Sequence, residues 1–471
     1  MLSENIHNDL KTRRLELLKF GMINNVSGGI QVDINAVTKK LPNDHFSDAA
    51  LCDHNCRTFT GGQETGHYDC PASFTVNKGV NIQTLSPADL LLKGIQIAAE
   101  GVRQFNQMFL ESGFDDYTKR FNINKGIEKD IFEQTLKSPK VEVNCFGGNP
   151  ELHPKILEII RGLDGFAVNL TTTGGIFMRD EKFPEKLLVS PPEIIALSAD
   201  DFENADHIKT LSQLRLDQLK TQRNDIPAIY GQKRKAHEAI YVAKLAQRFS
   251  QFPQILFNLV VHEGNILYIE EIITTLRTIF PGVIVNPYPA QSSFSYSSPV
   301  FNEDHLQTFE EFIDRRIEEH LEHKTGIVPR LHYWLLLKSI FETYRENSPE
   351  ISRQISGYNT WKCYKTPGAD RYIQIGTSPQ EHDGKKTAGG HLNCFWNSKT
   401  IVDSKQVWDS EPEYIANYLA RGLQGLASHV PTPCPGCLMP RLTFDEISLE
   451  LGMNESLIPS YLNLRNQTAG F

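Results

Sequence analysis

The stretch from Val141 to Gly175, VEVNCFGGNPELHPKILEIIRGLDGFAVNLTTTGG, decides the fold of this chain. It holds two short apolar runs, 141–146 and 166–172, with a helical segment at 155–162 between them. Runs of this length that stay apolar without strict alternation are typical of parallel strands buried on both faces. The stretch therefore predicts one strand–helix–strand unit of an α/β protein.

The same alternation of strands and helices continues along the chain. Further strands are predicted at EIIALSA (193–199), QILFNLVVH (254–262) and GVIVNPYPA (282–290). Helices are predicted at about 87–113, 127–136, 232–251, 265–279 and, as one long region, 306–346. A first strand, for which HFSDAAL (45–51) is the candidate, would bring the number of strands to six.

Polar and glycine residues follow nearly every predicted strand. They are Gly147, Gly148 and Asn149, then Thr172, Thr173 and Gly174, then Ser198 and Asp200, and last His262, Glu263 and Asn286. In parallel βα architectures the functional groups lie at the carboxyl ends of the strands. We therefore expect these residues to face one common mouth.

A second signal lies upstream, in the glycine-rich stretch LCDHNCRTFTGGQETGHYDC. It holds Cys52, Cys56 after three intervening residues, and Cys70 after thirteen more. Thiolates are soft ligands that suit zinc, copper(I) or iron–sulfur clusters. Three of them on one loop can hold a cubane cluster and leave one iron open. Unrelated cysteines, or a zinc site completed by His54 or His67, explain the same pattern.

Four more cysteines, Cys363, Cys394, Cys434 and Cys437, lie in the last third of the chain. The final pair forms a CxxC between prolines, TPCPGCLMP, which is a rigid two-thiol clip. Four thiols can enclose one metal, so this region predicts either a structural zinc ribbon or a second iron–sulfur cluster. Cys145, at the end of a predicted strand, is expected to be a small buried hydrophobe instead.

The overall composition restricts the class of protein. The chain has 471 residues and a net charge of −9, with acidic and basic residues interspersed, so we expect no nucleic-acid partner. No apolar run reaches the roughly 18 residues that cross a bilayer, and the N-terminus lacks the apolar core of a signal peptide. We therefore expect a cytoplasmic protein without a membrane partner. In that compartment eight cysteines indicate metal or redox chemistry rather than disulfides.

Taken in order, these motifs resemble the radical S-adenosylmethionine (SAM) superfamily over residues 51–290. The cysteine loop comes first, and CFGGNPELHPKILEII is similar to the family's Gly-Gly-Glu-Pro motif and its helix. LTTTGG is similar to the Thr-Asn-Gly end of the third strand, and IIALSAD to the Ser-x-Asp of the fourth. Two positions depart from the family pattern. The second cysteine interval is eleven residues longer than in Cys-x3-Cys-x2-Cys, and Asn149 stands where the family has Glu.

The resemblance implies a partial (β/α)6 TIM-like barrel with a smaller C-terminal auxiliary-cluster domain of the SPASM or twitch kind. Cys52, Cys56 and Cys70 would hold a [4Fe–4S] cluster whose open iron chelates SAM. The residues implied in binding SAM are Gly147, Gly148, Asn149, Ser198, Asp200 and Tyr68. Those implied in holding the auxiliary cluster are Cys363, Cys394, Cys434 and Cys437. The expected domains are an N-terminal helical extension (1–45), the barrel (46–300), a helical connection (301–355) and the auxiliary-cluster domain (356–471).

The activity implied is reductive cleavage of SAM to a 5′-deoxyadenosyl radical, which abstracts hydrogen from a C–H bond of a small metabolite or a peptide. A flavodoxin- or ferredoxin-like protein would donate the electron. Two other classes stay open, a zinc-dependent βα-barrel hydrolase and a non-catalytic zinc-binding protein. The chain lacks the HxH or HExxH arrangement that such a hydrolase would use.

Overall fold

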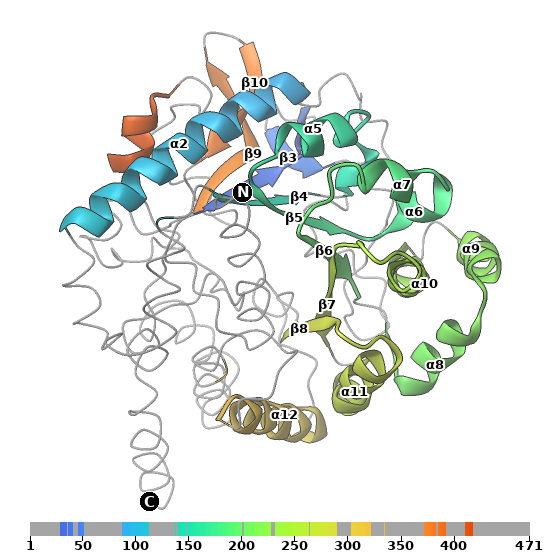
Figure 1. Cartoon of the computed structure of the whole chain (residues 1–471). Helices are drawn as coiled ribbons and strands as arrows, with labels where there is room; N and C mark the ends of the chain where they lie inside the picture. Colours follow the sequence, from blue (N-terminus) through green and yellow to red (C-terminus); the bar gives the residue numbers. More distant parts are fainter. Residues whose placement is uncertain are drawn as a thin grey trace, which may run out of the picture.

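A curved eight-stranded sheet organises the protein. The computed structural model describes residues 29–34, 36–40, 46–50, 87–112, 137, 140–147, 149–199, 202–227, 231–262, 264–289, 303–321, 334, 372–382, 385–391 and 410–417. The strands of the large sheet lie in the order β10-β9-β1-β4-β5-β6-β7-β8. Figure 1 shows the sheet curving from β10 at the top of the view to β8 below its middle.

Six of these strands form a parallel series in which each lies beside its predecessor. They are β1 (Gly29–Asp33), β4 (Glu142–Phe146), β5 (Ala167–Thr172), β6 (Ile194–Ser198), β7 (Gln254–Val261) and β8 (Ile284–Pro289). The strands predicted at 141–146, 166–172, 193–199, 254–262 and 282–290 are confirmed as β4 to β8. The prediction of an α/β protein with a parallel sheet is therefore also confirmed.

The first strand of the parallel series is not the one that the sequence favoured. HFSDAAL does contain a strand, β3 (Phe46–Ala50), but β3 pairs antiparallel with β2 (Ala36–Lys40) in a separate two-stranded sheet. The strand beside β4 is β1, in which Ile30 and Val32 are fully buried. The physical reason is apolar content, because FSDAA has a single large apolar residue to bury. The parallel sheet thus begins upstream of the expected boundary at residue 46.

A segment from late in the chain extends the sheet on the other side of β1. β9 (Tyr372–His382) runs parallel to β1, and β10 (Lys385–His391) pairs antiparallel with β9. Both strands come from the range 356–471, in which we expected a separate domain. β1 therefore lies between strands contributed by two distant parts of the sequence.

The described helices lie along the outer, convex side of the sheet (Figure 1). They are α2 (Ala88–Ser112), η5 (Pro150–Leu152), α5 (Ile156–Gly162), α6 (Gly175–Arg179), α7 (Phe183–Leu187), α8 (Ala205–Gln213), α9 (Leu216–Asp225), α10 (Gly231–Ala246), η7 (Ile266–Tyr268), α11 (Ile269–Ile279) and α12 (Glu303–Leu321). Among the described residues, no helix is both long and apolar enough to cross a bilayer. The helix predicted at 127–136 falls outside them.

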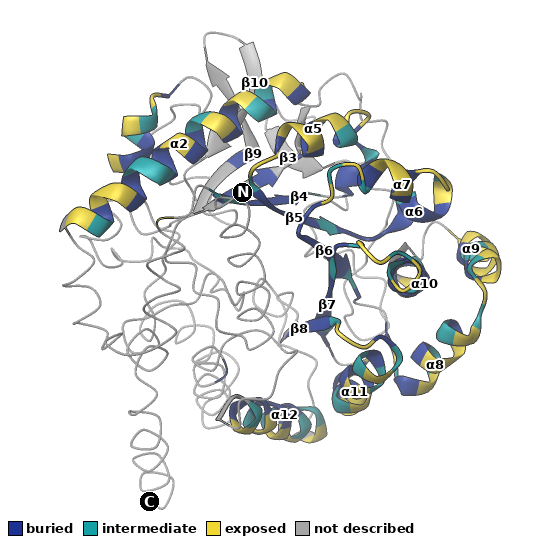
Figure 2. Cartoon of the chain, viewed as in Figure 1, coloured by how far each residue is buried: buried dark blue, intermediate teal, exposed yellow. Residues whose placement is uncertain are grey.

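The core lies between the sheet and these helices, as the buried positions in Figure 2 indicate. Alternate strand residues, such as Val143, Leu170 and Phe257, are fully or almost fully buried in one cluster with the helices. Cys145 belongs to this cluster and is fully buried, which confirms its expected role as a small hydrophobe. Burial raises the pKa of its thiol to about 12.

A buried arginine fastens α12 to α11. Arg316, which is 1% exposed, donates to both carboxylate oxygens of Glu270 at 2.9 Å and pairs with Glu319 at 2.9 Å. Its guanidinium also lies 5.1 Å from the centre of the Phe312 ring, which meets Trp334 edge-on. This contact is at the far end of the sheet from β1 and gives a reference point for stability measurements.

Candidate functional site

Two predicted site residues lie directly after β4. Gly147 has φ of +100°, a left-handed conformation that glycine adopts without steric cost. Asn149 is fully buried and precedes the short helix η5, where its carbonyl oxygen accepts a hydrogen bond from Leu152 N at 2.9 Å. The chain therefore leaves β4 through a left-handed glycine and enters η5 at Asn149.

A third predicted residue, Ser198, is the last residue of β6. It is half-buried, and in the sheet register it lies beside Asn258 of β7. Because β4, β5 and β6 are parallel neighbours, their ends all lie at one edge of the sheet. The structure therefore brings Gly147, Asn149 and Ser198 to the same edge, with the end of β5 between them.

The other predicted site residues lie outside the described part of the chain. They are Gly148, Asp200, Tyr68, Cys52, Cys56, Cys70, Cys363, Cys394, Cys434 and Cys437. Their roles stay predictions. Among the described residues, no group of three or more His, Cys, Asp or Glu side chains could hold a metal ion.

The described residues fit part of the implied cofactor set. Cys145 is the one cysteine among them, and its fully buried side chain packs within the apolar core, which assigns it to packing. An iron–sulfur cluster would depend on the other cysteines. Asn149 supplies an amide and Ser198 a hydroxyl at the same edge, and both groups donate and accept hydrogen bonds, as the polar groups of SAM would require.

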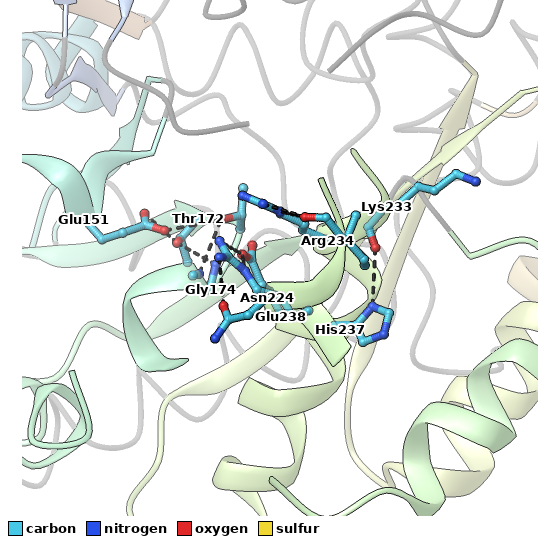
Figure 3. Close-up of polar contacts among 12 residues, drawn as sticks. Glu151, Thr172, Gly174, Asn224, Lys233, Arg234, His237 and Glu238 are labelled. Atoms are coloured by element: carbon cyan, nitrogen blue, oxygen red, sulfur yellow. Dashed lines mark hydrogen bonds and ion pairs between the residues drawn. The ribbon is translucent and has the colours of Figure 1, made fainter. Parts of the chain in front are cut away.

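A buried carboxylate that sequence reasoning missed ties two of the motifs together. Glu151 of η5 is 4% exposed, and Figure 3 shows it pointing toward Thr172 at the end of β5. Its Oε2 accepts from the Thr172 hydroxyl at 2.7 Å, and its Oε1 accepts from the Thr173 hydroxyl at 3.3 Å. The contacts join residues that are 21 and 22 positions apart in the sequence, so no local pattern predicts them.

A second buried carboxylate, Glu238 of α10, lies against the same turn from the helical side. It is fully buried and pairs with Arg223 of α9, whose Nε lies 2.7 Å from its Oε1. A Cβ placed on Gly175 would lie 3.0 Å from that same oxygen. The glycine pair after β5 is thus packed closely against an ion pair in the helical layer.

The inner face of the sheet, opposite the helices, carries a ladder of asparagines. On β4 and β5, Asn144 and Asn169 are buried and both donate to Glu142 Oε1 at 3.1 Å. On β7 and β8, Asn286 Nδ2 donates to Asn258 Oδ1 at 2.8 Å. The sequence carried this signal, since each of these apolar strands holds one asparagine at an inward position.

The asparagine pair of β7 and β8 lies nearer the carboxyl edge than an apolar layer. That layer consists of Ile194, Ala196, Leu256 and Ile284, which form a cluster separate from the main core. Since Asn286 donates to Asn258, the Asn258 NH₂ group and the Asn286 oxygen point away from this bond. The pair is half-buried and presents one donor group and one acceptor beside Ser198.

The predicted polar residue after β7 is used within its own turn. His262 Nδ1 accepts a hydrogen bond from Gly264 N at 3.0 Å, and His262 N donates to Asn265 Oδ1 at 2.9 Å. Asn265 Nδ2 in turn donates to Val260 O at 2.9 Å. Because Nδ1 is an acceptor here, a neutral His262 ring carries its proton on Nε2. His262 therefore shapes the loop.

Comparisons with known proteins leave the family open. No protein-family model matches the chain, and no curated protein matches its sequence. Among solved structures, it is similar to SuiB from Streptococcus suis, with a TM-score of 0.43 and 10% identity over 85% of this chain and 68% of that one. SuiB bound to S-adenosylmethionine gives a TM-score of 0.35 and 12% identity over 65% of this chain and 62% of that one. SuiB bound to the precursor peptide SuiA gives 0.34 and 14% identity over 66% and 62%.

Proposed function

We propose that this chain is a radical SAM enzyme built on a partial (β/α)6 barrel. The observation that carries the proposal is the arrangement of three motifs resembling those of that superfamily. Gly147 and Asn149, Thr172 to Gly174, and Ser198 follow or end three consecutive parallel strands, in the expected order and at one edge of the sheet.

In this proposal Cys52, Cys56 and Cys70 hold a [4Fe–4S] cluster. When bound, the cluster supplies the electron that splits SAM into methionine and a 5′-deoxyadenosyl radical, which removes hydrogen from a substrate C–H bond. Cys363, Cys394, Cys434 and Cys437 hold a second cluster. A flavodoxin- or ferredoxin-like protein is the proposed reductant, and the substrate is a small metabolite or a peptide.

The chain's own residues bind and orient the reactants. Gly147 lets backbone approach the methionine end of SAM without a Cβ clash. The Asn149 amide oxygen accepts from the methionine amino group, and the Ser198 hydroxyl bonds the carboxylate or the ribose, with Gly148, Asp200 and Tyr68 assisting. The neutral Asn149 gives up the charge-assisted part of the contact that the family's Glu provides.

The asparagine ladder suits the substrate side of such a site. Amide side chains offer both donors and acceptors without adding charge, and the Asn258–Asn286 pair presents both at the carboxyl edge. The apolar cluster of Ile194, Ala196, Leu256 and Ile284 lies deeper along the strands and helps to exclude water from a reactive radical.

The test begins with anaerobic purification of the full chain and measurement of iron, sulfide and zinc. Dithionite and SAM are then added, and 5′-deoxyadenosine is sought. About eight irons per chain with 5′-deoxyadenosine formed would support both clusters, and about four would support one. Zinc without iron, and no 5′-deoxyadenosine, would reject the proposal in favour of a zinc protein.

Two cysteine variants sharpen this test. Cys52→Ala should abolish cleavage of SAM, and retained cleavage would reject the assignment of the cysteine loop. Cys145→Ala is the matched control, because Cys145 is buried in the core and its thiol is protonated. The control should keep its iron content and its SAM cleavage while it loses some stability.

A further inference from the structure

The residue that invites a further role is Glu151, which neither the strand pattern nor the motif resemblance assigned. The residue is 4% exposed, and burying a carboxylate is costly unless hydrogen bonds compensate. Each of its two oxygens accepts from a different hydroxyl, that of Thr172 at 2.7 Å and that of Thr173 at 3.3 Å.

The same two hydroxyls also form hydrogen bonds with the backbone of the glycine turn. Thr172 Oγ1 accepts from Gly174 N at 3.0 Å, and Thr173 Oγ1 accepts from Gly175 N at 3.3 Å. Each hydroxyl therefore donates to the carboxylate and accepts from a glycine N–H. The result is two chains of hydrogen bonds that link one carboxylate to the glycine turn after β5. In a buried setting the successive bonds of such a chain strengthen one another.

The glycine turn is itself fixed from the helical side. Gly174 has φ of +92°, and a Cβ there would lie 2.8 Å from Val242 of α10. Gly175 lies against Glu238, which pairs with Arg223. The turn therefore cannot shift toward the helices, and it offers Glu151 a rigid anchor.

The backbone of Glu151 lies in the short helix η5, and Asn149 is the residue that caps the start of this helix. Leu152 N donates to Asn149 O at 2.9 Å, and His153 N donates to Pro150 O at 3.0 Å. Only Pro150, whose φ is restricted, separates Asn149 from Glu151. The position of Asn149 is therefore coupled to the position of the Glu151 carboxylate.

We propose that Glu151 is a positioning residue that fastens Asn149, a proposed SAM-binding residue, to the Thr172–Thr173 end of β5. This inference rests on the proposed function. In place of a carboxylate that touches the methionine amino group, the chain holds an amide at that position and uses a carboxylate two residues later to hold the amide in place. Glu151 acts through Asn149 and makes no contact with SAM itself.

The test compares Glu151→Gln with a matched control, Glu270→Gln. Glu270→Gln also removes a carboxylate that accepts hydrogen bonds within the fold. Its partner is Arg316, at the contact between α11 and α12. The two measurements are the melting temperature and the dissociation constant for SAM, taken by anaerobic equilibrium dialysis of the iron-loaded full chain. Both variants should have a lower melting temperature than the native chain. Only Glu151→Gln should also raise the dissociation constant for SAM, by about tenfold.

A threonine pair keeps the test decisive if Glu151→Gln does not fold. Thr173→Val removes a hydroxyl that donates to Glu151 and should weaken SAM binding, whereas Thr173→Ser retains the hydroxyl and should bind SAM like the native chain. Unchanged SAM affinity in Glu151→Gln, or in Thr173→Val where Glu151→Gln cannot be made, would overturn the positioning role. A native chain that binds no SAM would overturn the proposed function, and the positioning role with it.

Discussion

Removing Glu238 should destabilise the protein strongly, because it is one half of a buried ion pair. Glu238 is fully buried and Arg223 is 6% exposed, with a closest contact of 2.6 Å between Arg223 and Glu238 Oε1. Glu238→Ala leaves the guanidinium in the core without this carboxylate, and breaking a buried pair in that way costs about 3–5 kcal/mol. Against a typical stability of about 5–15 kcal/mol, the loss is large.

Replacing both members of the pair should cost much less stability than removing the carboxylate alone. Replacing both residues by apolar ones of similar volume, as in Arg223→Met with Glu238→Leu, removes the charge and its desolvation cost together. We therefore expect the double variant to recover most of the lost stability. A double-mutant cycle of Arg223→Met and Glu238→Leu gives the interaction free energy between the two positions.

The assay is urea denaturation followed by circular dichroism. The midpoint is compared among the native chain, Glu238→Ala, the single variants Arg223→Met and Glu238→Leu, and the double variant. Exposed Lys209→Ala, which removes a surface pair with Asp206, serves as the control and should shift the midpoint little. A Glu238→Ala variant as stable as that control would refute the reasoning. It would mean that water or a rearranged side chain replaces the carboxylate at no cost.

Three further predictions concern single groups. Gly174→Ala should lower the melting temperature more than Gly165→Ala. Both glycines have φ near +91°, but only a Cβ on Gly174 would meet a neighbour, Val242 at 2.8 Å. Equal losses in melting temperature would show that backbone strain alone matters. Burial lowers the pKa of both His207 and His237, so below pH about 6.5 the unfolded chain binds more protons than the folded chain. The free energy of unfolding should therefore fall as the pH drops below about 6.5. A variant with both His207→Gln and His237→Gln should show a flatter profile of melting temperature against pH. Cys145 should resist iodoacetamide until the protein unfolds, as mass spectrometry of labelled peptides can check, because its thiol is buried and its pKa is about 12.

The sequence was sufficient for the strands that carry long apolar runs and insufficient for those that pair over long distances. β4 to β8 could be predicted because each is a run of buried residues next to its neighbour along the chain. β1, whose sequence is GIQVD, is short and carries two polar residues. Its place in the sheet depends on partners at Glu142 and Tyr372, which no local pattern connects to it.

The same distinction holds at the candidate site. Gly147, Asn149 and Ser198 could be placed because a residue that follows a parallel strand must lie at the carboxyl edge of the sheet. Glu151 could not, because its importance comes from two hydroxyls that fold back on it from the next strand. Local patterns locate the ends of elements, but contacts between those ends depend on how the elements pack.

The pairing of β9 with β1 affects the order in which the protein can be completed during synthesis. Gly29 leaves the ribosome early, yet its sheet partner Tyr372 is made only after most of the chain has emerged. Until then one edge of β1 offers unpaired backbone groups that can pair with other chains. A chain cut before residue 372 would keep that edge open permanently. Residues 372–391 therefore act as the closing segment of the sheet, and dissection experiments should retain them with the first strand.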